Sequence, residues 1–376
     1  RKGRNNTLVA GPDDPGSPFG IGSELGGHDT VDPLLGTMDD FKALCQRAHE
    51  LGLEIALDFA LQCSPDHPWV KAHPNWFRHK PDGSIAFAEN PPKKYQDIYP
   101  IDFNADMPGI EKEVERIMNL WIEAGVTIFR IDNPHTKPVR FWQDVIAAVT
   151  KKHPEILFLA EAFTRPGMMR ALSYVGFTQS HCYFPWRNTK DELEEYLPVT
   201  KHNTFWPTTP DILTAYVRDN GVAGHCVRAV LAAMGSPSWG IYNGYELIEN
   251  KQRPGFEEQI DNEKYEVKVR DWSKAKQYGV AEMLTALNKI RRAHPAALSY
   301  HNLTVLPTSD PNILAFARHT PAELTGTGQA DTLIVVVNLD GHNAHQSMIH
   351  LELSELGLPT DRPLNVRDEL TGREFQ

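Results

Sequence analysis

The chain has 376 residues, of which 41% are apolar and 23% are charged. This composition is ordinary for a folded protein of two or three domains, and it excludes a fibre or a disordered tail. The 38 basic and 49 acidic residues give a net charge of −11, which argues against nucleic acid or an anionic membrane surface as a partner. The sequence shows no apolar run of the roughly 18 residues that a membrane span needs, and no secretory leader.

The four cysteines are scattered along the chain and form no C-x-x-C pair. They are Cys45, Cys63, Cys182 and Cys226. Such spacing is typical of reduced thiols, and it gives little support to disulfides or to a zinc site. The sequence therefore favours a cytoplasmic protein.

The first half of the chain alternates helices with short apolar strands. Residues 1–37, rich in Gly, Pro, Asn and Asp, predict a long loop with functional side chains. Residues 63–109 are too long for an ordinary loop and predict an inserted excursion with its own small aromatic core. Helical spacing is found at 38–52, 110–124, 138–152 and 165–176, and each of these segments precedes a strand-like run. This alternation predicts a parallel sheet.

The second half changes character near residue 298. Before that point we expect helices at 212–220, 227–234 and 278–294, and a strand-like run at 238–246. After it, short strands are expected at 302–306, 313–318, 332–339 and 347–353, with a hairpin starting near residue 366. This pattern predicts an antiparallel β domain. We therefore expect a catalytic domain over 1–297, with 63–109 inserted, and an incomplete β domain over 298–376.

Acidic residues stand at or shortly after the ends of several of these strands: Asp58, Asp132, Glu161 and Asp211. Acids at the carboxyl ends of successive strands, with helices between them, describe the catalytic rim of a (β/α)₈ barrel. Each acid alone could cap a helix, Asp211 most readily. Four acids at equivalent strand ends are poorly explained as four helix caps that arose by coincidence.

Arg130 and Asp132 lie two residues apart on one strand, so their side chains point to the same face. An arginine beside an aspartate keeps the carboxylate ionised, as a nucleophile requires. A lone Arg-x-Asp is more often a structural ion pair. The other acid-bearing strand ends favour the catalytic interpretation here.

With these strand ends, the sequence resembles the α-amylase superfamily of glycoside hydrolases. The segment 129–132, Phe-Arg-Ile-Asp, matches the nucleophile strand, Glu161 the acid/base, and Asp211 the third acid, which grips the sugar ring. Gln62-Cys63 and Thr209-Pro210 stand where most of the superfamily has Asn-His. Loss of both sugar-clasping histidines argues against an ordinary amylase.

Those departures, with the segments 2–6 and 130–137, resemble the bacterial α-1,4-glucan:maltose-1-phosphate maltosyltransferases. The resemblance implies a TIM barrel, no metal or organic cofactor, and a homodimer for the intact protein. It also implies that an N-terminal domain and the first two barrel strands precede this chain. Only six candidate strands are then present, ending near Asp58, Asp132, Glu161, Phe184, Trp206 and Tyr242. We expect a gap between the first and the last of them, or a partner segment filling it.

The activity that this resemblance implies is transfer of a maltosyl unit from α-maltose 1-phosphate to the non-reducing 4-hydroxyl of an α-1,4-glucan, in glycogen synthesis. Asp132 would attack the anomeric carbon while Glu161, kept protonated by a less polar setting, assists departure of phosphate. Glu161 would then activate the acceptor hydroxyl, so that two inversions give retention. The two carboxyl groups are expected to lie about 5–5.5 Å apart.

The resemblance also implies a donor pocket. The residues that match the family's phosphate pocket are Lys2, Gln62, Asn90, Lys93 and Tyr95. An amide, an ammonium and a phenol in the proline-stiffened segment 90–95 are groups that donate to phosphate oxygens, although Lys93-Lys94 alone would more often be a solvated pair. Arg130, Asn133 and His135 complete the expected substrate-binding set, and His135 suits a packing or capping role equally well.

Two alternatives remain open from the sequence. One is a hydrolase or another transglycosylase of the same superfamily acting on α-1,4-glucans, because acceptor choice depends on how the site sheds water. The other is a non-catalytic glucan-binding protein that keeps the fold. The intact acids Asp132, Glu161 and Asp211 weigh against the second alternative.

Overall fold

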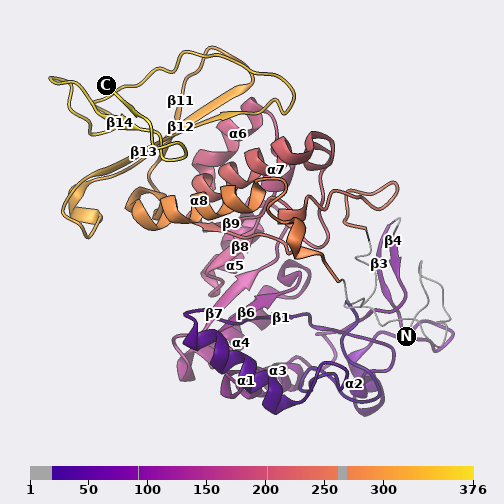
Figure 1. The fold of residues 1–376 in the computed structure, drawn as a ribbon. Coiled ribbons are helices and arrows are strands. Elements are labelled where there is room, and N and C mark those ends of the chain that lie inside the picture. Colours follow the sequence, from indigo (N-terminus) through magenta and orange to yellow (C-terminus); the bar gives the residue numbers. More distant parts are fainter. Residues whose placement is uncertain (1–18, 92, 201, 261–268) are drawn as a thin grey trace. The chain divides into compact units, whose positions relative to one another are not determined.

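The computed structural model describes residues 19–91, 93–200, 202–260 and 269–376, with the side chains of Asn90 and Lys93 excepted (Figure 1). The chain forms two compact units. Of the described residues, the first unit contains those from 19 to 181, and the second contains those from 182 to 260 and from 269 to 376.

The first unit is built on four parallel strands in the order β1 (Ala56–Phe59), β6 (Ile128–Ile131), β7 (Leu157–Ala160) and β8 (Gln179–His181). Ala56 pairs with Ile128, and Ile128 with Leu157, so the first three strands run in register and end together. Phe129, Ile131, Phe158 and Ala160 are fully buried. The predicted parallel sheet is therefore present.

Helices connect these strands. They are α1 (Met38–Glu50), α3 (Met107–Glu123), α4 (Val139–Lys152) and α5 (Pro166–Tyr174), each within three residues of its predicted bounds. Figure 1 shows α1, α3 and α4 gathered on one side of β1, β6 and β7.

Capping side chains explain where these helices begin. Thr37 and Asp40 form a capping box at the start of α1, and the Asp106 carboxylate accepts from the Gly109 N–H at the start of α3. Helix α3 then buries Ile110, Val114, Ile117, Met118 and Trp121 at helical spacing. This apolar stripe fixes the face that α3 turns toward the core.

The excursion after β1 is a small subdomain of the first unit. Its elements are β2 (Gln62–Cys63), α2 (Pro68–Ala72), a 3₁₀ turn (Pro74–Trp76), β3 (Ala88–Asn90), β4 (Lys93–Tyr95) and β5 (Tyr99–Pro100). Strand β2 pairs with β5, and β3 forms a hairpin with β4. Trp69, Trp76 and Phe77 are buried, but they belong to the same core as Phe59 and Phe129 and not to a separate core of the excursion.

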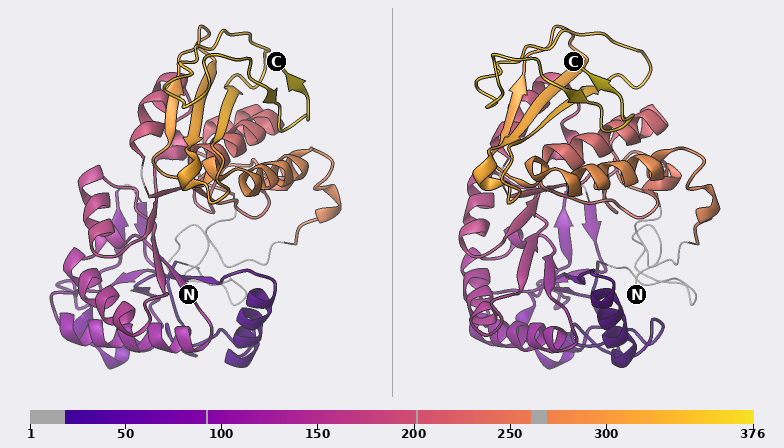
Figure 2. Two further views of the ribbon diagram at one scale, coloured as in Figure 1. Left: turned by 90° about the vertical axis from the view of Figure 1, so that its left-hand side faces the viewer. Right: turned by 60° about the vertical axis from the view of Figure 1, so that its left-hand side comes forward.

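The second unit combines α/β and all-β parts. Strands β9 (Asn203–Phe205) and β10 (Ser238–Trp239) pair in parallel, accompanied by α6 (Lys190–Tyr196), α7 (Ala215–Gly235) and α8 (Val280–Ala293). Short 3₁₀ turns cover 184–186, 197–199, 245–247, 272–274, 295–298 and 322–324. Beside α6 and α7 lies the antiparallel sheet of β11 (Leu303–Leu306), β12 (Ile313–Thr320) and β13 (Asp331–Asn338) (Figure 2). The hairpin of β14 (Val366–Arg367) and β15 (Glu374–Phe375) confirms the last predicted element.

Two predictions for the second unit are wrong in detail, and one is confirmed. The two helices expected at 212–220 and 227–234 are present as the two segments of α7, which meet at a kink at the non-helical Gly221 with φ 51° and ψ −127°. The run 238–246 keeps only two strand residues before the chain turns through Gly244, where φ is 102°. The segment 347–353 forms a single bridge, between Ile349 and Thr308, and the Ser347 hydroxyl accepts from the backbone N–H groups of Ser309 and Asp310.

The number of barrel strands stays a prediction. The first unit contributes four described parallel strands and the second contributes two. The expected gap and the expected division at residues 297 and 298 also stay predictions. Over the described ranges, no helix combines the length and apolar character that crossing a bilayer would need.

Candidate active site

The site in the first unit lies where β1, β6 and β7 end together. Asp58 pairs with Arg130 across β1 and β6, and the last pair between β6 and β7 is Ile131 with Ala160. Asp132 and Glu161 are the next residues of their strands, and their backbone N–H groups still bond to Phe59 O (3.1 Å) and Ile131 O (3.0 Å). Neighbouring strands lie about 4.8 Å apart. Two acids therefore project from adjacent positions at one sheet edge.

Arg130 connects the acids. One guanidinium nitrogen, Nη1, lies 2.9 Å from both Asp58 carboxylate oxygens and 3.4 Å from Asp132 Oδ1, and the other, Nη2, lies 3.0 Å from Glu161 Oε1. The Asp132 and Glu161 side chains are only 14% and 9% exposed. Burial opposes the charge on Arg130, but Glu161, Asp58 and Asp132 together raise its pKa above the ordinary value. The guanidinium therefore stays charged and holds three carboxylates.

The turn after Asp132 is unusual. Asn133 adopts the left-handed conformation with φ 42° and ψ 53°, and a 3₁₀ turn over Pro134–Thr136 follows. The Lys137 ammonium bonds to the carbonyl oxygens of Asp132 (3.1 Å) and Asn133 (3.2 Å). His135 is half-buried, and its pKa is lowered by burial and then by the Lys137 charge. A neutral His135 can accept a hydrogen bond at one ring nitrogen.

The predicted phosphate-binding residues are only partly described. Lys2 lies outside the described residues, as do the side chains of Asn90 and Lys93, whose backbones pair directly across the hairpin of β3 and β4. Tyr95 is half-buried on β4. The Gln62 amide donates to the carbonyl oxygen of Phe19 (2.6 Å) and so connects Phe19 to the start of β2. Whether these residues bind phosphate stays a prediction.

Asp211 lies in the second unit. Its backbone N–H donates to the Thr209 hydroxyl (3.2 Å), within a tight turn closed by backbone bonds between Thr209 and Ile212. Helix α7 begins at Ala215 with Thr214 as its N-cap residue. The alternative that Asp211 caps this helix is therefore wrong.

Two side chains beside the predicted site were missed from the sequence, Lys137 and His181. His181 ends β8, and burial, assisted by the Arg130 charge, lowers its pKa to about 3. Lys137 could have been found from the sequence, because it is the last residue of the segment 130–137 on which the resemblance to the maltosyltransferases rests.

A buried group of His28, His67 and Cys63 resembles a metal site, because one ligand atom from each lies within 4.8 Å of the others. The hydrogen bonds argue against a metal ion. The Trp69 N–H donates to His67 Nδ1 (3.0 Å), so the proton of neutral His67 is on Nε2 and points to His28 Nδ1 (2.9 Å). His28 Nε2 then donates to the carbonyl oxygen of Ala60 (2.8 Å). All four ring nitrogens are occupied, and burial lowers the pKa of His28 to about 4 and that of His67 to about 3.

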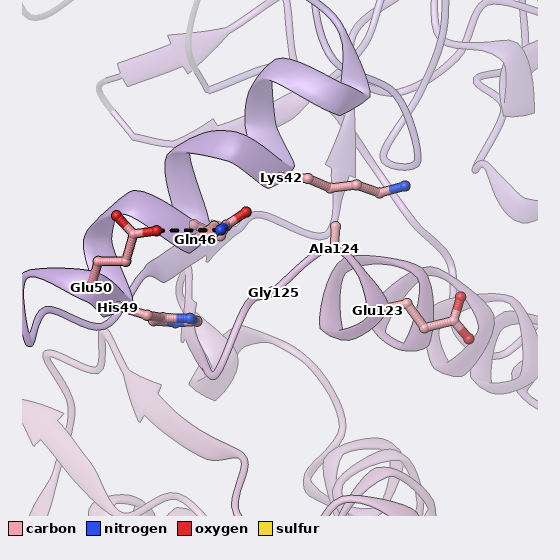
Figure 3. Close-up of a pocket in the computed structure, with 8 residues that line it drawn as sticks. Lys42, Gln46, His49, Glu50, Glu123, Ala124 and Gly125 are labelled. Atoms are coloured by element: carbon pink, nitrogen blue, oxygen red, sulfur yellow. Dashed lines mark hydrogen bonds between the residues drawn. The ribbon is translucent and has the colours of Figure 1, made fainter.

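A shallow cavity of about 390 Å³ lies between α1 and the end of α3, lined mainly by polar side chains such as Lys42, Gln46 and Glu123 (Figure 3). Its floor includes Gly125, which precedes β6, whereas Asp132 follows β6. The cavity therefore lies at the opposite end of this strand from the acids. In barrel enzymes that end serves stability rather than catalysis.

Solved structures with a similar fold include an α-amylase and a trehalulose synthase. The α-amylase from Geobacillus thermoleovorans complexed with acarbose has a TM-score of 0.64 at 15% identity, covering 81% of this chain and 73% of its own. A trehalulose synthase mutant has a TM-score of 0.65 at 14% identity, covering 88% and 82%. The chain thus has a fold similar to that of these two enzymes.

Comparison of the sequence with known proteins identifies more similar relatives than the structures do. A family model described as "GLGE, C-terminal" matches residues 305–376. An α-1,4-glucan:maltose-1-phosphate maltosyltransferase of Bifidobacterium longum strain NCC 2705 is 98% identical over the whole chain, which covers 51% of that relative. Enzymes of the same name from Bifidobacterium animalis subsp. lactis and Streptomyces coelicolor are 75% and 52% identical, with 52% and 56% of their lengths covered.

These matches confirm the resemblance predicted from the sequence: the chain is a homologue of the α-1,4-glucan:maltose-1-phosphate maltosyltransferases. It spans about half the length of the relatives that it matches.

Proposed function

We propose that the chain carries the catalytic acids of a retaining maltosyltransferase. The donor is α-maltose 1-phosphate, the acceptor is the non-reducing 4-hydroxyl of an α-1,4-glucan, and phosphate is released. The observation that carries the proposal is the Arg130 guanidinium, which joins Asp132 and Glu161 at adjacent strand ends. The near-identical relative named for this reaction supports the choice of donor and acceptor.

The reaction proceeds in two displacements. The Asp132 carboxylate attacks the anomeric carbon, a covalent maltosyl ester forms, and the bond to the phosphate oxygen breaks. Glu161 then takes the proton of the acceptor hydroxyl as that oxygen displaces Asp132. Arg130 keeps Asp132 ionised and aimed, and Asp211 hydrogen-bonds the hydroxyls next to the reacting carbon. No step calls for a metal ion or an organic cofactor.

The test is release of inorganic phosphate from α-maltose 1-phosphate by the full-length protein, with and without glycogen. A maltosyltransferase releases phosphate and lengthens the glucan. A hydrolase releases maltose without a glucan acceptor, and a non-catalytic binding protein releases neither. Asp132→Asn should abolish phosphate release in the first two cases. Glucan binding alone, with no turnover, would reject the proposal.

The donor phosphate is bound by the segment 90–95 together with Lys2 and Gln62. Lys93→Ala should weaken use of α-maltose 1-phosphate far more than use of α-maltosyl fluoride, which lacks the phosphate. Its neighbour Lys94 is exposed and provides the matched control, since Lys94→Ala removes the same charge from the next position. Equal losses on both donors would mean that Lys93 only supports the hairpin.

Two further expectations belong to this proposal. The homodimer implied by the resemblance is tested by the solution mass of the full-length protein. A cytoplasmic location agrees with four cysteines that are all free.

A further inference from the structure

The strand that carries Asp132 ends in a left-handed turn. Asn133 is one of three non-glycine residues with positive φ among those described. Asparagine tolerates this conformation better than most residues do, but it is uncommon for any residue with a side chain. The turn decides where the Asp132 carboxylate and the Asn133 amide point, because both residues lie at its start.

Hydrogen bonds to main-chain oxygens hold this turn. The Thr136 hydroxyl donates to the Asn133 carbonyl oxygen (2.7 Å), and the indole of the fully buried Trp142 on α4 donates to the Pro134 carbonyl oxygen (3.1 Å). Of the three donor side chains, only Lys137 bonds to two main-chain oxygens, those of Asp132 and Asn133. It is also the only charged donor of the three, and charge-assisted bonds are about twice as strong as neutral ones.

The Lys137 ammonium also lies within electrostatic range of both catalytic acids. Burial lowers its pKa, and the Asp132 and Glu161 carboxylates partly oppose that effect. The ammonium is thus a second cation of the site, beside Arg130. Arg130 contacts the carboxylates directly, whereas Lys137 reaches Asp132 through its main chain.

We propose that Lys137 is a positioning residue that clamps the left-handed turn at Asn133 and thereby aims the Asp132 carboxylate at the anomeric carbon. This inference rests on the proposed maltosyl transfer. It differs from a phosphate-binding role, because a clamp acts on the nucleophile whatever group leaves. Misplacement of a reacting group by 1 Å can cost about 100-fold in rate.

The test compares Lys137→Met, Lys137→Arg and Thr136→Val in the full-length protein. Thr136→Val is the matched control, since it removes a neutral bond to the same Asn133 oxygen. The first measurement is kcat and KM for phosphate release with glycogen. The second is the rate at which 2-deoxy-2-fluoro-α-maltosyl fluoride labels Asp132, followed by mass spectrometry. Thermal midpoints establish that each variant is folded, and Lys137→Gln replaces Lys137→Met if the latter does not fold.

We expect Lys137→Met to lower kcat and the labelling rate about 10- to 100-fold, on the scale of such misplacement, with KM nearly unchanged. Lys137→Arg should recover much of the loss, and Thr136→Val should lose far less. A loss confined to the KM for α-maltose 1-phosphate, with normal labelling, would overturn the inference in favour of phosphate binding. Equal behaviour of the Met and Val variants would overturn it as well.

The labelling measurement separates this inference from the proposed function. If the unmodified protein labels at Asp132 but releases no phosphate from α-maltose 1-phosphate, the proposed function fails. The role of Lys137 is then still decided by the relative labelling rates.

Discussion

Removal of Arg130 tests whether one guanidinium holds the site together. In Arg130→Gln, the Asp132 and Glu161 carboxylates, 14% and 9% exposed, lose their shared cation. Breaking a buried ion pair from one side costs about 3–5 kcal/mol. Asp58 is 63% exposed and adds less than about 1 kcal/mol. We therefore expect the first unit to lose about 3–5 kcal/mol of stability at pH 7.

Calorimetry of the full-length protein measures this loss. For a unit of this size, 1 kcal/mol corresponds to about 2–4 °C in the unfolding midpoint, so the midpoint should fall by at least about 6 °C.

The chain provides a matched arginine for this experiment. Arg116 also contacts two carboxylates, those of Asp29 and Glu113, both at 2.7 Å, but it is 48% exposed. Arg116→Gln should cost less than about 1 kcal/mol. If the two variants lose equal stability, the reasoning from burial is refuted.

Two further predictions concern the first unit. Burial lowers the pKa of His28 to about 4 and that of His67 to about 3. Below pH 6.5 the unfolded chain therefore binds protons at these histidines that the folded chain does not bind, so the temperature of unfolding should decrease as the pH is lowered from 6.5 toward 4. His67→Gln should make this decrease smaller, and an unchanged pH dependence would contradict the assignment. Gly125→Ala places a Cβ 2.7 Å from Cys45 Cβ at φ +108°, so it should lower the free energy of unfolding by about 2–3 kcal/mol. Gly52→Ala, with φ +73° and no atom within 4 Å, should lower it by only about 1 kcal/mol. Equal losses of unfolding free energy in chemical denaturation would rule out the clash with Cys45.

The sequence predicted the helices and parallel strands of the first unit because local signals agree with the tertiary packing. The apolar spacing of α3 and the capping box of α1 are both readable within one segment of chain. The shared face of Arg130 and Asp132 follows from the two-residue period of a strand. For these features the neighbours in sequence are also the neighbours in space.

The side-chain contacts of the site could not be predicted, because they depend on the register between strands or on hydrogen bonds to main-chain carbonyl oxygens. The contacts of Arg130 with Asp58 and Glu161 join segments 72 and 31 residues apart, and only the pairing of β1, β6 and β7 brings them together. The pairing of His28 with His67 spans 39 residues. Lys137 bonds to carbonyl oxygens, which every residue carries, so no residue type marks its partners.

The contact between Arg130 and Glu161 bears on how Glu161 acts in the proposed reaction. A guanidinium nitrogen 3.0 Å from Oε1 favours the carboxylate form of Glu161, whereas assistance to a leaving group requires the protonated form. Phosphate is a good leaving group and needs little protonation, but the glucan hydroxyl is a poor nucleophile until a base removes its proton. In the proposed reaction we therefore expect Glu161 to act mainly in the second displacement.

Glu161→Gln tests this division of labour. The variant should release about one equivalent of phosphate per active site in a rapid burst and then turn over slowly, because the maltosyl ester on Asp132 forms but no base activates the acceptor. Rapid-quench phosphate measurements and the mass of the intact protein, increased by one maltosyl unit, check the two halves of this expectation. Asp132→Asn should give neither burst nor added mass. A Glu161→Gln variant as slow as Asp132→Asn in the first turnover would show that proton donation to the phosphate is essential, and that the ion pair with Arg130 must break before the donor can react.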